Sequence, residues 1–112
     1  MVQADVLASI AGFASLPIAI VVVEIEGTIY AVNEAAERLL GRPADQIVGR
    51  KAWEVAPGME HVWGELIAHA RAHGSYRGEI TAATPNQHRH ISYVACVREH
   101  AGRSYVVGVA VD

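Results

Sequence analysis

The hydrophobic positions of this chain fall into separate runs, and the pattern of each run predicts one element. The run Ile18–Val23 has no polar alternation, so it predicts a strand that is covered on both faces. Residues 59–73 repeat hydrophobic side chains every three or four positions, which predicts the longest helix. Three strands are then expected at the end of the chain, at residues 76–83, 88–98 and 103–111.

The stretch 28–41 predicts a strand that turns directly into a short helix. Asn33 is suited to cap this helix, because its side-chain oxygen can accept a hydrogen bond from a free N–H group of the first turn. Gly41 is suited to end the helix, since glycine readily takes the left-handed conformation found there. Two short helical turns are expected at 44–48 and 51–55.

Residues 2–15 have the pattern of an amphipathic helix that Pro17 would end. Its apolar stripe consists of Val2, Val6, Ile10 and Phe13. Two interpretations are compatible with this stripe: the helix lies over its own domain, or it is shared across a homodimer interface. We therefore divide the chain into a flanking helix at 1–15 and one domain at 16–112.

The predicted order is one helix, two strands, several short helices, one longer helix and three strands. Strands joined in hairpins at both ends of a domain, with helices between them, imply an antiparallel sheet that is covered on one face. The sequence therefore predicts the α+β class.

This succession of elements resembles that of PAS domains. The resemblance rests on Val32–Gly41, Ile47–Arg50, Val97–Glu99, Gly102 and Gly108–Asp112, and it covers residues 16–112. It implies a five-stranded antiparallel sheet in the order 2-1-5-4-3, with the short helices and the longer helix walling a pocket against one face. It also implies a sensory or dimerisation module covalently attached to an output domain such as a kinase, a cyclase or a DNA-binding domain.

Composition narrows the class of protein further. The 112 residues carry a net charge of −3 with scattered basic residues, which argues against a nucleic-acid surface. No apolar run is long enough to cross a bilayer and no signal-peptide pattern is present, so we expect a cytoplasmic protein without a membrane contact. The single cysteine, Cys96, excludes an intramolecular disulfide.

Two PAS chromophores are not expected. The flavin-binding LOV subfamily needs a cysteine in an Asn-Cys-Arg-type motif, which this chain lacks, so an FMN photoadduct is disfavoured. The segment 49–58 resembles photoactive yellow protein, but Gly58 stands where that family carries its chromophore cysteine. Val32 and Ala36 also replace its polar groups, which disfavours p-coumaric acid.

Heme remains an alternative, because heme-binding PAS domains often ligate the iron from the long helix. His69 and His73 are the candidate ligands, although a surface or helix-terminal role explains both equally well. His88 and His90 share one face of a strand, which leaves two interpretations: a weak metal site, or, as we favour, an exposed strand end.

The candidate pocket lining comes from the last two strands and the helices. Aligning the C-terminal residues with the family turns alternate residues of the last strand toward the pocket, with alternate residues of the preceding strand beside them. The predicted lining is Trp53, Trp63, Ile67, Ser92, Val94, Cys96, Val106, Gly108 and Ala110. Alternatively, the tryptophans fill the pocket. The outer sheet face is expected to be apolar and to need cover from the N-terminal helix or a second subunit.

No catalytic motif was found, so an enzyme is not expected. Two main hypotheses follow: a sensory input module that binds a small ligand, or a ligand-free protein-interaction module that sets dimer geometry. The heme-binding gas or redox sensor is the third. The sequence does not name the ligand, the signal or the output domain.

Overall fold

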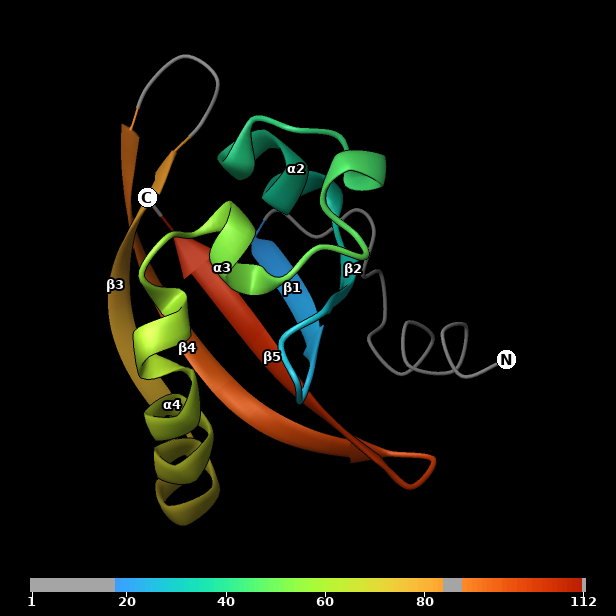
Figure 1. Cartoon of the computed structure of the whole chain (residues 1–112), viewed down its shortest axis with the longest axis vertical. Helices are drawn as coiled ribbons and strands as arrows, with labels where there is room; N and C mark the ends of the chain where they lie inside the picture. The colour runs from blue at the N-terminus through green and yellow to red at the C-terminus, as the bar shows by residue number, and fades with distance from the viewer. Residues whose placement is uncertain (1–17, 84–87, 112) are drawn as a thin grey trace.

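The structure, a computed structural model, describes residues 18–83 and 88–111. One antiparallel sheet has the order β2-β1-β5-β4-β3, which confirms the predicted class and strand order. Its strands are β1 (Ala19–Glu24), β2 (Ile29–Val32), β3 (Tyr76–Ala83), β4 (His88–His100) and β5 (Arg103–Val111). Between β2 and β3 the chain forms α2 (Glu34–Leu40), the 3₁₀ turn η2 (Ala44–Gln46), α3 (Ala52–Val55) and α4 (Met59–His73). These helices all lie over the same face of the sheet (Figure 1).

Asn33 fixes the junction between β2 and α2. Its Oδ1 atom accepts hydrogen bonds from the Ala36 N–H at 3.0 Å and from the Ile20 N–H at 2.9 Å. Its Nδ2 group donates to the Ile18 carbonyl at 2.8 Å, and the side chain is only 1% exposed. The predicted helix cap is therefore confirmed, and the same side chain also ties α2 to the start of β1.

The β4–β5 hairpin is longer than the sequence predicts by two residues of β4. Glu99 pairs with Ser104 and His100 pairs with Arg103, which leaves a two-residue turn. Both turn residues have positive φ, 52° at Ala101 and 78° at Gly102, as the tight hairpin turns that match strand twist require.

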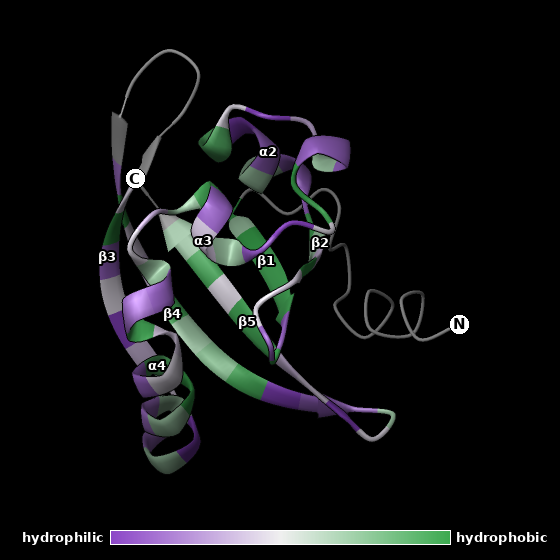
Figure 2. Cartoon of the chain, in the orientation of Figure 1, coloured by the Kyte–Doolittle hydropathy of each residue, from purple (hydrophilic) through white to green (hydrophobic). Residues whose placement is uncertain are grey.

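Strand β1 is buried on both faces, as its unbroken apolar run predicts. Ala19 and Val23 pack under the helices, whereas Ile20 and Val22 belong to a second cluster on the outer face with Tyr105. Figure 2 shows hydrophobic residues along β1 and along the parts of β4 and β5 behind the helices. The sheet therefore separates two apolar layers.

The predicted N-terminal helix, with Val2, Val6, Ile10 and Phe13, lies outside the described residues. Within the described part of the chain, no helix combines the length and the apolar character needed to cross a bilayer.

Candidate functional site

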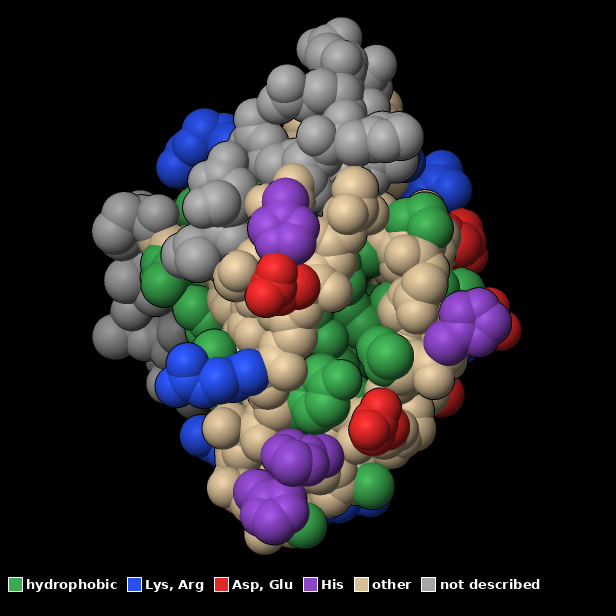
Figure 3. Space-filling view, turned by 90° about the vertical axis from the view of Figure 1, so that its left-hand side faces the viewer, with side chains coloured by type: hydrophobic (Ala, Val, Ile, Leu, Met, Phe, Trp, Pro, Cys, Tyr) green, Lys and Arg blue, Asp and Glu red, His purple; other side chains and the backbone are tan. Residues whose placement is uncertain are grey.

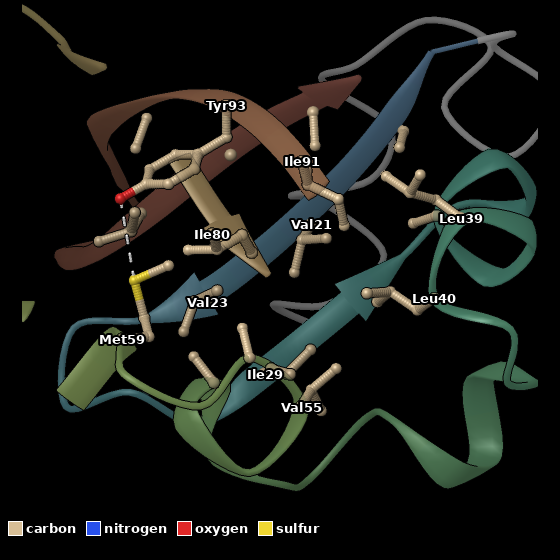
Figure 4. Close-up of a pocket in the computed structure, with 18 of the residues that line it drawn as sticks. Val21, Val23, Ile29, Leu39, Leu40, Val55, Met59, Ile80, Ile91 and Tyr93 are labelled. Carbon is tan, nitrogen blue, oxygen red and sulfur yellow. Dashed lines mark hydrogen bonds between the residues drawn. The ribbon is translucent and has the colours of Figure 1, made fainter. Parts of the chain in front are cut away.

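An apolar cavity of about 100 Å³ lies between the inner face of the sheet and the helices (Figure 4). All five strands and three helices contribute to its wall. The twenty lining residues are Ala19, Val21, Val23, Ile29, Ala36, Leu39, Leu40, Ala52, Val55, Ala56, Met59, Trp63, Leu66, Ile80, Ile91, Tyr93, Ala95, Val106, Gly108 and Ala110.

Small residues at the centre of the sheet leave the space for this cavity. Ala95 pairs with Gly108 and Tyr93 pairs with Ala110 across β4 and β5, so these side chains share one face. Strand alternation adds Val106 to the same face. Alternate residues of β5 therefore face the cavity, as predicted.

The prediction for β4 was wrong by one residue. Ser92, Val94 and Cys96 pair with Val111, Val109 and Val107 and therefore lie on the outer face, away from the cavity. The physical reason is the two-residue turn at 101–102, which pairs odd-numbered residues of β4 with even-numbered residues of β5. Counting outward from that turn would have given Ile91, Tyr93 and Ala95, the residues that line the cavity.

The two tryptophans do not fill the cavity. Trp63 lines the cavity, and its indole N–H donates to the Ile25 carbonyl at 2.9 Å. Trp53 lies outside the lining, in an edge-to-face contact with Trp63 with ring centroids 6.2 Å apart. A Cβ atom on Gly27 would lie 2.4 Å from the Trp53 ring, so this ring rests directly on the β1–β2 turn. Ile67 packs against the core but does not line the cavity.

Tyr93 carries the single hydroxyl group of the lining. Its hydroxyl lies 4.0 Å from the Met59 Sδ atom, a weak acceptor, at one end of the cavity (Figure 4). Burial raises the pKa of Tyr93 to about 12, so the phenol is neutral at physiological pH. The ring lies against Gly78 on the edge strand β3, where a Cβ atom would come within 2.5 Å of the hydroxyl oxygen.

The side of the molecule that carries β3 and α4 is hollowed. Figure 3 shows hydrophobic side chains exposed in this hollow, between the edge of the sheet and the helical layer. The cavity lies between the same two layers.

The histidines proposed as heme ligands lie elsewhere. His69 and His73 are exposed on α4, with ring centroids 4.4 Å apart, and His69 also contacts Tyr76. Among the described residues, no histidine or cysteine lines the cavity, so the predicted histidine ligation of a heme iron has no counterpart in its wall, where Met59 and Tyr93 are the side chains able to ligate iron. His90 forms an exposed pair with Glu79 at 2.5 Å. No group of three or more side chains suited to hold a metal ion occurs in residues 18–83 and 88–111.

A family model and several solved structures match this chain over most of its length. A family model described as "PAS fold" matches residues 13–111. A PAS domain from Colwellia psychrerythraea has a TM-score of 0.81 and 25% identity, with 96% of this chain and 97% of that chain covered. A domain of a sensory box sensor histidine kinase/response regulator from Geobacter sulfurreducens has a TM-score of 0.74 and 20% identity, with 98% and 94% covered.

A third structure is the PAS domain, in complex with ethanol, of a LuxR-family transcriptional regulator from Burkholderia thailandensis. Its TM-score is 0.72 and its identity 16%, with 87% of this chain and 90% of that chain covered. A search of curated proteins found no match.

Proposed function

This chain belongs to the PAS fold family, and on that basis we propose that it is the sensory input module of a larger signalling protein. The observation that carries the proposal is the apolar cavity enclosed between the sheet and the helices. In this proposal a small ligand occupies the cavity, and an attached output domain, such as a kinase, a cyclase or a DNA-binding domain, responds. The module acts in the cytoplasm, by sensing and without catalysis of its own.

Strand β5 is the proposed route of the signal out of the cavity. Three of its residues, Val106, Gly108 and Ala110, line the cavity, and the strand lies between β1 and β4 in the middle of the sheet. A ligand that presses on these residues would shift β5 relative to both neighbours. A ligand that presses on the Trp63 ring would also displace the β1–β2 turn, because the Trp63–Ile25 hydrogen bond links the two.

A second candidate function is a ligand-free interaction module that sets the geometry of a homodimer. Its supporting observation is the apolar outer face, where partly buried Tyr30, Val107 and Val109 pack on a buried cluster of Ile20, Val22, Ala31 and Tyr105. In this alternative the outer face and the stripe of Val2, Val6, Ile10 and Phe13 form the dimer interface, and the cavity has no occupant.

A thermal-shift screen of small metabolites on the wild-type chain and a Gly108→Val variant separates the two functions. A Cβ atom at position 108 would lie 3.8 Å from the nearest atom, the Val21 carbonyl oxygen, which is an ordinary contact, and the methyl groups of a valine would take up part of the cavity that Gly108 lines. The sensor hypothesis predicts compounds that raise the melting temperature of the wild type alone. A screen without any such compound, together with a dimer by size-exclusion chromatography, would favour the interaction module.

A further inference from the structure

Taking the proposed sensory role as the premise, we infer that the cavity binds an uncharged, hydrocarbon-like molecule of about four to six non-hydrogen atoms. Three properties of the wall define this ligand class: its lack of charge, the existing hydrogen bonds of its polar groups, and its volume.

The wall offers no partner to a charged ligand. Tyr93 is the single ionisable residue among the twenty that line the cavity, and its raised pKa keeps it neutral. An ion that leaves water for such a wall loses its hydration without a counter-charge, which is strongly unfavourable. Carboxylates, phosphates and ammonium groups are therefore rejected.

The two polar groups of the wall are already engaged. The Trp63 indole N–H donates to the Ile25 carbonyl at 2.9 Å, and the Tyr93 hydroxyl donates to the Met59 sulfur at 4.0 Å. The strands of the wall pair their backbone groups within the sheet. A hydrogen-bond acceptor on the ligand would therefore give up its bonds to water without a free donor to replace them, which favours a hydrocarbon-like molecule, and the lone pairs of the Tyr93 hydroxyl oxygen are left to accept from a ligand donor.

The volume sets the size of the ligand. An apolar cavity of about 150 Å³ holds one benzene molecule, and this cavity measures about 100 Å³. The depth comes from Ala95, Gly108 and Ala110, since larger side chains at these positions would fill the space. A heme or a flavin is several times too large for this cavity.

Three five-membered rings of nearly equal shape test this inference: cyclopentane, tetrahydrofuran and pyrrolidinium. Amide chemical shifts of the ¹⁵N-labelled chain are followed during titration with each ring at neutral pH. We expect cyclopentane to bind with a Kd of about 1 mM or lower, with the largest shifts in β5, α3 and α4. Tetrahydrofuran should bind several-fold more weakly, and pyrrolidinium at least about 100-fold more weakly.

Two variants locate the binding. Gly108→Val should abolish cyclopentane binding, because the space that the added side chain leaves empty is too small for the ring. Gly64→Ala is the matched control, since Gly64 is an exposed residue of α4 with open space around its Cβ position. This control should bind cyclopentane like the wild type. Cyclopentane shifts that persist in Gly108→Val would contradict the assignment to this cavity.

Failure of this inference can be told apart from failure of the sensory role. If tetrahydrofuran or pyrrolidinium binds more tightly than cyclopentane, the ligand class is wrong. The same holds if none of the rings binds while the metabolite screen finds a cavity ligand, and in both cases the sensory role survives. If neither the rings nor the screen gives a cavity ligand, both proposals fall.

Discussion

Asn33 shows how much of this fold depends on a single side chain. It is buried, and it bonds to the backbone of three residues in two elements that are distant in the sequence. The Ile20 N–H and the Ile18 carbonyl at the start of β1 use this side chain as their partner. A buried backbone group that loses its partner destabilises the fold by more than the bond itself contributes.

We expect Asn33→Ala to lower the free energy of unfolding by about 2–4 kcal/mol, because it removes a helix cap and two bonds to β1. Asn33→Ser should lie between the wild type and the alanine variant, since serine retains the cap and loses the bonds to β1. Urea unfolding followed by circular dichroism measures both. Equal stability of the serine and alanine variants would show that the cap contributes nothing.

Tyr93 makes stability depend on pH in the alkaline range. Burial raises its pKa from 10.0 to about 12, so the folded state keeps a proton that the unfolded state loses first. Its contribution is complete below pH 10 and is lost as the pH rises toward 12. Tyr93→Phe should therefore reduce the fall in stability across this window, as measured by urea unfolding at a series of pH values. Some fall should remain, because burial also raises the pKa of Tyr30. An identical pH profile in the variant would contradict this account.

At the scale of elements, the sequence pattern predicted the type of every described element, and the family resemblance implied the strand order. The bounds of α4, β3 and β5 agree with the prediction because a glycine marks the turn just before each of them, at positions 58, 74 and 102. The inward face of β4 was missed, since both of its faces carry apolar residues and periodicity alone does not choose between them. The choice comes from the β4–β5 turn, whose length the pattern did not give.

Another element-scale feature is the seating of α3 on the β1–β2 turn. Trp53 of α3 packs directly on Gly27, and the edge-to-face contact continues to Trp63 of α4. The turn is also held by Lys51, whose Nζ atom lies 2.8 Å from Glu26 Oε2. A side chain at position 27 would separate these elements.

We expect Gly27→Ala to lower the free energy of unfolding by about 1–3 kcal/mol more than Gly49→Ala. Both glycines have a positive φ, 104° and 92°, so alanine is strained at either position. Position 49 has open space, whereas alanine at position 27 also collides with the Trp53 ring. Chemical denaturation of the two variants gives the difference directly. Equal losses would mean that the Trp53 contact contributes little.

At the scale of the whole molecule, the cavity results from a combination of elements that sequence reasoning reached only in part. Trp63, Val106, Gly108 and Ala110 were predicted as pocket lining and do line the cavity, although their contact with a ligand stays a prediction. Leu39, Leu40 and Val55 were missed as lining, because each reads as ordinary core on a helix face. Their place at the cavity depends on how the two short helices α2 and α3 pack on the sheet, which no local pattern encodes.

The central claim is that this cavity is an accessible site for a small apolar ligand, and xenon tests it most directly. Crystals of the chain pressurised with xenon should show a xenon atom between the sheet and the helices in the wild type and none in Gly108→Val, because xenon enters empty apolar cavities. A wild-type crystal with no xenon at this position, or with the Trp53 and Trp63 rings filling the space, would contradict the account.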